Sequence, residues 1–190
     1  MKPVLSILIL SIHSRKAMLD SLLLELNRQS EKYPGKCEIL VEVDGGQLSK
    51  GTKRNRLLEK AKGDYLAFFD DDDLPSKNYI SLILSAVQTN PDCCSLLGEI
   101  TIDGGVSEVF EHSLKYKVWK TNTSGPVKYE RCPNHLNAIR SSLAKQIKFK
   151  EINHGEDHQW SNDLQASGLL KTEGTIHEVL YYYNYISKKW

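Results

Sequence analysis

The most informative segment of this chain is residues 51–73, which read GTKRNRLLEKAKGDYLAFFDDDD. It joins a charged, helix-forming stretch and a Lys-Gly-Asp turn to an apolar run and four consecutive aspartates at 70–73. The apolar residues 65–69 predict a strand buried on both faces, as in a parallel sheet. The segment therefore predicts a helix followed by a strand that delivers four carboxylates to one end of a sheet.

The same signals recur before this segment. Residues 4–12, an apolar run interrupted by Ser6 and Ser11, predict a buried strand, and residues 37–43 predict a second strand. Between them, Ser14 is predicted to cap a helix whose apolar residues recur at three- and four-residue spacing. A second helix is predicted over residues 52–62, with Gly63 just beyond its end.

The order strand, helix, strand, helix, strand predicts an α/β fold with a mostly parallel central sheet flanked by helices. Pro75 is predicted to begin a third helix, which Asn90-Pro91 stops. In such sheets, ligands bind at the carboxyl ends of the strands. Polar clusters at residues 11–15, 44–46 and 70–73 fall there, so this edge is the predicted binding site.

The second half of the chain is less regular. The turn Asp103-Gly104-Gly105 predicts a hairpin. The elements predicted in this half are hairpin strands over 96–102 and 106–119, helices over 134–147 and 155–166, and a tyrosine-rich strand over 175–186. The last three residues are predicted to be a frayed end. Because no linker interrupts the pattern, residues 1–190 are predicted to form a single domain.

Composition excludes several classes of protein. The 190 residues include 25 Lys and Arg against 24 Asp and Glu, a net charge of +1, so no basic field favours nucleic acid or an anionic membrane. The longest apolar run is too short for a membrane span. The cysteines have no C-x-x-C spacing and predict reduced thiols in a cytoplasmic protein. They are Cys37, Cys93, Cys94 and Cys132.

The acidic run indicates metal chemistry. Four consecutive carboxylates repel one another, and a divalent cation relieves that repulsion. Mg²⁺ and Mn²⁺ prefer oxygen ligands and often share their shell with substrate phosphates. Side chains alternate in an extended segment, so Asp70 and Asp72 are predicted to reach one ion, while Asp71 is left for a sugar hydroxyl. Asp73 is predicted to cap the next helix. The alternative is a solvated acidic loop.

Four stretches, in this order along the chain, resemble the family 2 glycosyltransferases with the GT-A fold. Residues 51–73 are similar to the family's Arg-Asn helix, Lys-Gly-Asp turn and metal-binding acidic motif. Residues 6–15, SILILSIHSR, resemble the opening strand and its nucleotide-contacting loop. Residues 39–46, ILVEVDGG, resemble the second strand and its acidic turn. Residues 155–160, GEDHQW, resemble the Glu-Asp motif on the acceptor side.

The resemblance implies an enzyme that transfers a sugar from a nucleotide-diphosphate donor, with inversion at the anomeric carbon. It implies a UDP-sugar as donor, Mn²⁺ or Mg²⁺ as cofactor, and a hydroxyl of a glycan, glycolipid or glycoprotein as acceptor. Within the single domain, residues 1–92 are expected to bind the nucleotide-sugar and residues 93–190 the acceptor.

The resemblance also implies roles for residues on the donor side. Ser11, His13 and Asp44 are expected to line the base pocket, and Arg15 lies in the same nucleotide-contacting loop. Arg54 is expected to approach the base or the diphosphate.

The remaining roles concern the metal and the acceptor. Asp71 is expected to contact the ribose, and Asp72 to be the principal metal ligand, with Asp70 as a second ligand that also touches the nucleotide-sugar. Asp157 is the expected general base, because an acceptor hydroxyl needs a carboxylate to take its proton. Glu156 lies beside it. The alternative is that both acids only cap a helix.

Three further features leave alternatives open. His154 and His158 have the spacing of a helical zinc site, but Gly155 disfavours a helix there. His135 either contacts the acceptor or diphosphate, or is a structural histidine. Trp160 either stacks on an acceptor sugar or packs in the core.

Two other classes of function compete with the transferase. A nucleotidyltransferase or a metal-dependent phosphohydrolase could use the same acids, but nucleotidyltransferases usually have a Gly-rich basic loop after the first strand, and residues 11–15 contain no Gly. A non-catalytic nucleotide-sugar or glycan-binding module would not need both the acidic run and Glu156-Asp157. No histidine stands near Ile186, where many relatives have one, so the third metal ligand is open.

Overall fold

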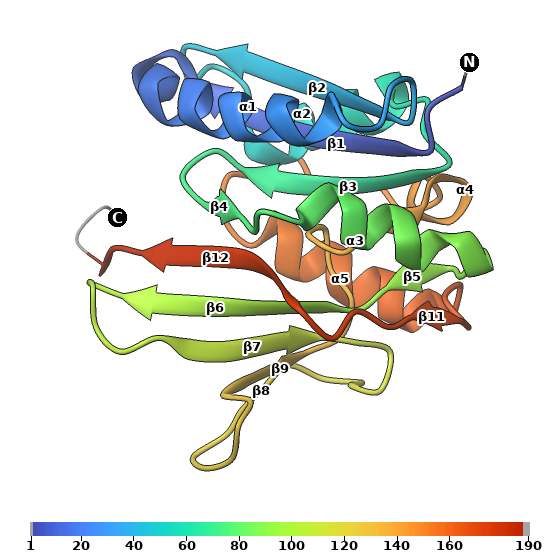
Figure 1. Ribbon diagram of the computed structural model, residues 1–190. Coiled ribbons are helices and arrows are strands. Elements are labelled where there is room, and N and C mark those ends of the chain that lie inside the picture. The colour runs from blue at the N-terminus through green and yellow to red at the C-terminus, as the bar shows by residue number, and fades with distance from the viewer. Residues whose placement is uncertain (1, 188–190) are drawn as a thin grey trace.

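The computed structural model describes residues 2–187; the predicted frayed end at residues 188–190 lies outside this range. The described residues form two six-stranded sheets with helices packed against them (Figure 1). The strands are β1 (Leu5–Ile12), β2 (Cys37–Asp44), β3 (Tyr65–Asp70), β4 (Leu74–Pro75), β5 (Cys93–Cys94), β6 (Leu96–Ile102), β7 (Glu108–His112), β8 (Lys120–Thr121), β9 (Tyr129–Arg131), β10 (Ile139–Arg140), β11 (Glu173–Gly174) and β12 (Val179–Tyr185). The helices are η1 (His13–Arg15), α1 (Lys16–Ser30), α2 (Lys50–Lys60), α3 (Tyr79–Ala86), η2 (Val87–Thr89), α4 (Ser141–Ala144) and α5 (Glu156–Ser167).

The first sheet has the strand order β11-β5-β10-β3-β1-β2. Strand β1 lies between β2 and β3 and runs parallel to both, so Leu8 is opposite Leu40 on one side and Phe68 on the other. Only β10 pairs with its neighbours in the antiparallel sense. The predicted mostly parallel central sheet is confirmed, and the carboxyl ends of β1, β2 and β3 meet at one edge.

A core layer covers each face of this sheet. Leu5, Ile7 and Ile9 of β1 pack toward α1 and α3, whereas Leu8 and Leu10 belong to the cluster formed with α2 and α5. Leu5, Ile7, Leu8 and Ile9 are fully buried. Because β1 is covered on both sides, its residues 7–10 are apolar without alternation, and Ser6 and Ser11 are buried with them.

The second sheet, with the order β4-β12-β6-β7-β9-β8, was not expected as a separate layer. Its β6–β7 hairpin closes through Asp103 and Gly104, both with positive φ (51° and 73°), which confirms the predicted turn. The second hairpin strand ends at His112, earlier than predicted. Strand β10 of the second half of the chain pairs with β3 of the first half, so the two halves share one sheet.

Two predicted helix starts are wrong. A 3₁₀ turn occupies residues 13–15, so α1 begins after Arg15 and Ser14 caps nothing. Pro75 does not begin a helix, because it lies in β4 opposite Tyr181 of β12. The third helix, α3, starts only at Tyr79.

Two further predictions are also corrected. Gly63 does not have the positive φ of a helix-ending glycine. It is needed for a close approach instead, because an added Cβ would lie 2.6 Å from the backbone nitrogen of Ser6. The expected helix at residues 134–147 is divided into β10 and the short α4, since Ile139 pairs with Leu66 of β3.

The described residues form no helix long and apolar enough to cross a membrane. Cys37, Cys93, Cys94 and Cys132 are not joined by disulfides in the described structure.

Candidate functional site

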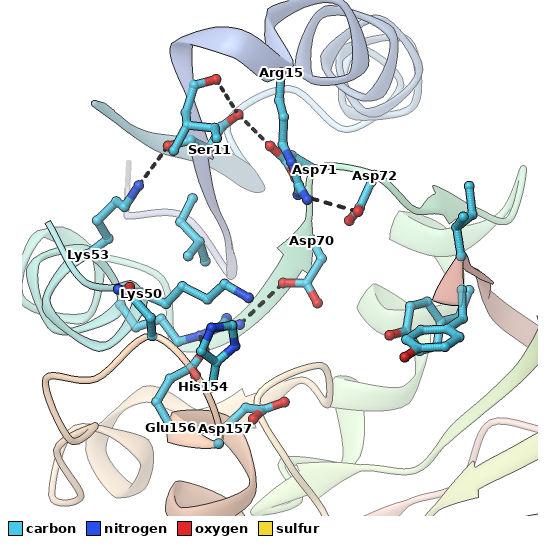
Figure 2. Close-up of a pocket in the computed structure, with 18 of the residues that line it drawn as sticks. Ser11, Arg15, Lys50, Lys53, Asp70, Asp71, Asp72, His154, Glu156 and Asp157 are labelled. Atoms are coloured by element: carbon cyan, nitrogen blue, oxygen red, sulfur yellow. Dashed lines mark hydrogen bonds and ion pairs between the residues drawn. The ribbon is translucent and has the colours of Figure 1, made fainter. Parts of the chain in front are cut away.

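A cleft of about 450 Å³ opens at the carboxyl edge of β1 and β3, where the topology predicted it. Its walls come from the end of β1, η1, α2, the acidic run, the first turn of α5 and the end of β12 (Figure 2). The predicted site residues that line it are Ser11, Arg15, Arg54, Asp70, Asp71, Asp72, Glu156 and Asp157. This volume is sufficient for a small-molecule ligand.

Asp70, the last residue of β3, faces Arg54 and His135. Its Oδ1 lies 3.3 Å from Nη2 of Arg54, and its Oδ2 lies 3.7 Å from Nε2 of His135. Burial acts to raise the pKa of Asp70, but Arg54 and His135 outweigh it and hold that pKa well below its usual range. Asp70 is therefore compensated within the protein.

Asp71 is buried and points toward β1 and η1. Its Oδ2 accepts a 2.5 Å hydrogen bond from Oγ of Ser11, and its Oδ1 lies 2.7 Å from Nη1 of Arg15. The same Nη1 lies 3.3 Å from Asp72. Asp71 and Asp72 thus share one guanidinium, and the predicted alternation of sides is wrong, because β3 ends at Asp70 and the chain turns there.

Asp73 does not cap α3, whose N-cap residue is Asn78. It is buried and accepts hydrogen bonds from Oη of Tyr181 at 2.6 Å and from the backbone nitrogen of Asn184 at 3.2 Å. Burial, with the negative charge of Asp70, raises the pKa of Asp73 to about 8 against these hydrogen bonds. Asp73 therefore connects β12 to the acidic run through these two hydrogen bonds.

Asp72 lines the cleft, and its Oδ2 lies 3.3 Å from Nη1 of Arg15. Burial and the charges of Asp70 and Asp71 raise its pKa, although Arg15 opposes this. A carboxylate in this state fits a hard divalent cation. No three His, Cys, Asp or Glu side chains converge on a common ion position within residues 2–187. An ion on Asp72 and Asp70 would need oxygen atoms of a substrate phosphate to complete its shell.

Lys53 is a cleft residue that the sequence analysis missed. Its Nζ lies 2.5 Å from Oδ1 of Asp44 and 2.9 Å from the carbonyl oxygen of Ser11. The hydrogen bond from Lys53, supported by the backbone N–H of Leu48, lowers the pKa of Asp44 to about 2. Asp44 does not line the cleft itself, but it contacts Lys53, which does. The spacing in the sequence could have indicated that Lys53 points inward, because Lys53 precedes the buried Leu57 by four residues and lies on the same face of the helix.

His13, which was expected in the base pocket, and His135, for which a ligand contact and a structural role were both open, lie outside the cleft surface. His13 is exposed in η1 and is not among the residues that line the cleft. His135 is 3% exposed and lies behind Asp70, and neither ring nitrogen has a hydrogen-bond partner among the described residues. Neither side chain forms part of the cleft surface.

The acceptor-stacking interpretation of Trp160 is wrong. The side chain is fully buried, stacks on Phe149 with ring centroids 4.8 Å apart, and donates from Nε1 to the carbonyl oxygen of Ile147. The aromatic residues that line the cleft are Tyr183 and Tyr185 of β12, which the sequence analysis did not assign.

The Glu-Asp pair opens helix α5. Gly155 precedes it with φ 79°, a conformation that favours glycine. Asp157 lines the cleft and accepts a 2.8 Å hydrogen bond from the backbone nitrogen of His158. Glu156 is 3% exposed and its Oε1 lies 3.4 Å from Nε of Arg54. Of the two acids, Asp157 is the more exposed. His154 precedes the helix, so the helical zinc spacing is not realised.

The sequence comparisons identify one family. The family model "Glycosyl transferase family 2" matches residues 23–135, more than half of the chain, and ends before Glu156 and Asp157. The minor teichoic acid biosynthesis protein GgaB of Bacillus subtilis (strain 168) is 26% identical over 159 residues, which are 81% of this chain and 17% of GgaB. The chain thus spans less than a fifth of that relative's length.

Solved structures show the same fold. S. aureus TarS 1-349 superposes with a TM-score of 0.64 at 18% identity, over 97% of this chain and 60% of that one. TarS 1-349 in complex with UDP-GlcNAc gives a TM-score of 0.63 at 18% identity, over 97% and 58%. The catalytic domain of Drosophila beta1,4galactosyltransferase 7 in complex with xylobiose gives 0.57 at 15% identity, over 93% and 66%.

Proposed function

Because this chain belongs to glycosyl transferase family 2 and has the GT-A fold, we propose that it transfers a sugar from a nucleotide-diphosphate donor to an acceptor hydroxyl. The observation that carries the proposal is the meeting, in one cleft, of the acidic run, Arg15 and the first turn of α5. Arg15 and the acidic run on one wall of the cleft suit a charged donor. The carboxylate of Asp157 on the wall formed by α5 suits an acceptor hydroxyl.

The donor is proposed to be a UDP-sugar, and the fold relative TarS 1-349 has been solved with UDP-GlcNAc. Arg15, which lines the cleft and pairs with Asp71 and Asp72, is the proposed contact to the diphosphate. Lys53 holds the carbonyl oxygen of Ser11 and so fixes the backbone beside the nucleotide position. Asp71 is the proposed ribose contact.

Transfer is proposed to proceed with inversion. Asp157 takes the proton of the acceptor hydroxyl, whose oxygen forms a bond to the anomeric carbon from the face opposite the diphosphate. The bond from that carbon to the diphosphate oxygen breaks, and its electron pair leaves with the nucleoside diphosphate. Mn²⁺ or Mg²⁺ held by Asp72 and Asp70 would neutralise the departing diphosphate as a Lewis acid.

The acceptor is proposed to be a glycan or glycoconjugate hydroxyl. The name of GgaB adds teichoic acid to the acceptors that should be tested. A metal-dependent phosphohydrolase remains the second candidate, because it would use the same acidic run. The products separate the two: transfer releases the nucleoside diphosphate, whereas cleavage within the diphosphate releases the nucleoside monophosphate.

The test combines binding and turnover. Titration calorimetry with UDP-sugars and Mn²⁺ identifies the donor, and a transfer assay with that donor measures kcat. Replacing Asp157 by Asn should lower kcat by about 100-fold or more while donor affinity persists, because a general base acts on the acceptor. Asp163→Asn, on the same helix, is the matched control and should retain wild-type kcat. Near-normal turnover of Asp157→Asn would remove Asp157 as the base.

A further inference from the structure

We propose that Arg54 is a positioning residue that ties the first turn of α5 to the acidic run and so fixes the direction in which Asp157 faces. The proposal rests on the proposed function, since it concerns the base of that reaction. It also replaces the expected role of Arg54 as a direct contact to the base or diphosphate of the donor.

Arg54 joins three elements that are far apart in sequence. From α2, its Nη2 lies 3.3 Å from Oδ1 of Asp70 at the end of β3. Its Nε lies 3.4 Å from Oε1 of Glu156, 102 residues later in the chain. A guanidinium is a rigid, planar fork, so the two carboxylates are held in a fixed relation to each other.

The buried environment of Arg54 favours stable ion pairs with Asp70 and Glu156. The residue is 3% exposed, and its Cζ lies 5.0 Å from the ring centroid of Phe68 and 5.6 Å from that of Phe149. The two rings and the two carboxylates offset the loss of hydration of the guanidinium. Two of its three guanidinium nitrogens are used for these ion pairs, and Nη1 has no hydrogen-bond partner among the described residues.

The first turn of α5 depends on this contact. Its N-cap residue is Gly155, which has no side chain with which to cap the helix. Glu156 is buried, so without Arg54 its carboxylate would be an unpaired charge in the protein interior. The turn would then move to bring Glu156 into water. Asp157 is the next residue and would move with it, away from the direction it now faces.

The test compares Arg54→Met with Arg56→Met, a matched change on the same helix at a half-exposed arginine paired with Glu42. Positioning predicts that Arg54→Met lowers kcat by about 10-fold or more, since small misplacements of a catalytic group are costly, with little change in the donor KM. Arg54→Lys keeps the charge but loses the fork, and should recover part of kcat. Arg56→Met should keep wild-type kcat and KM.

A second readout does not depend on turnover. Hydrogen exchange at backbone amides 156–160 should accelerate in Arg54→Met and equally in Glu156→Gln, and the double variant should add nothing further. Exchange in β1 should stay as in the wild type. If Arg54→Met does not fold, Arg54→Lys serves in the same comparison, with a smaller acceleration expected.

Two outcomes would overturn the proposal. One is unchanged exchange at residues 156–160 in the Arg54 variants. The other is a loss that falls on the donor KM alone, which would make Arg54 a donor contact. A wild-type protein that transfers no sugar would contradict the proposed function, and the exchange comparison would still decide the role of Arg54.

Discussion

At the residue level, four adjacent aspartates have four different environments. Asp70 pairs with Arg54, Asp71 is held by Ser11 and Arg15, Asp72 faces the cleft, and Asp73 is bonded to β12. The protein therefore compensates Asp70 and Asp71, whereas burial and the neighbouring acids keep the pKa values of Asp72 and Asp73 raised. The sequence predicts where the run lies, but it does not predict these partners, because they depend on the turn after β3 and on residues far along the chain.

Asp72 is the residue on which the proposed metal dependence can be tested. Replacing it by Asn removes the proposed principal metal ligand from the cleft wall, so the Mn²⁺ concentration for half-maximal transfer should rise by about 10-fold or more. A metal titration of initial rates measures this. Asp20→Asn, at an exposed acid of α1, should leave the titration curve unchanged. An identical curve for Asp72→Asn would assign the metal to other ligands.

Ser11 has a structural effect that can be separated from binding. Ser11→Ala removes one of the hydrogen bonds to the buried Asp71, which should lower the free energy of unfolding by about 1–3 kcal/mol. Urea denaturation measures the change. Ser14→Ala, at an exposed position of η1, is the control and should stay within about 0.5 kcal/mol of the wild type. Equal effects of the two changes would mean that the bond to Asp71 contributes nothing to stability.

At the level of elements, α2 organises both walls of the cleft. It starts at Lys50 with Ser49 as N-cap, two residues before its predicted start, and carries Lys53 and Arg54 inward. Gly51 brings its first turn against the loop before α5, with its backbone nitrogen 3.2 Å from the carbonyl oxygen of Ile152. The sequence predicts this helix from its composition, but a tertiary contact sets where it begins.

Gly51→Ala tests this close approach. An added Cβ would lie 1.8 Å from the carbonyl oxygen of Lys150, which is backbone, so the helix and the loop must separate. We expect a loss of about 2 kcal/mol or more in the free energy of unfolding. Gly45→Ala meets only the flexible end of Gln47 and should cost less. A stable Gly51→Ala protein would show that the loop can shift at no cost.

At the level of the whole molecule, the sequence predicts one sheet and misses the other. The parallel strands β1 to β3 follow one another and are marked by apolar runs. The second sheet depends on β12, which pairs with β6 and with the two-residue β4. Such pairings join distant segments, and local periodicity carries no information about them. For the same reason, Tyr183 and Tyr185 were not predicted to line the cleft.

The pH dependence of global stability can be tested at His112 of β7. Burial lowers the pKa of His112 to about 3, and the charges of His135 and Arg131 act in the same direction. Its ordinary value of 6.5 applies in the unfolded chain, so the unfolded chain binds the proton first as pH falls. The contribution of His112 to stability is therefore complete above pH 6.5 and is lost as pH falls toward 3.

Between pH 7 and pH 5, His112 should remove about 2 kcal/mol from the free energy of unfolding. Asp73, with its raised pKa, acts in the opposite direction over this range. Urea denaturation at both pH values should therefore show a change in the wild type that is about 2 kcal/mol more unfavourable than the change in His112→Gln. His177→Gln, at an exposed histidine, should behave as the wild type. An equal change between pH 7 and pH 5 in the wild type and in His112→Gln would mean that His112 does not contribute to the pH dependence.

The bond between Tyr181 and Asp73 also has a consequence for the order of events in synthesis. The two residues are 108 positions apart, so the ribosome must deliver β12 long after it has delivered the acidic run. Closing so long a loop is slow compared with local helix formation. The parallel strands can assemble first, but the cleft acquires its final shape only when β12 arrives. A nascent chain that has not reached β12 therefore carries the family's acidic motif without the geometry to use it.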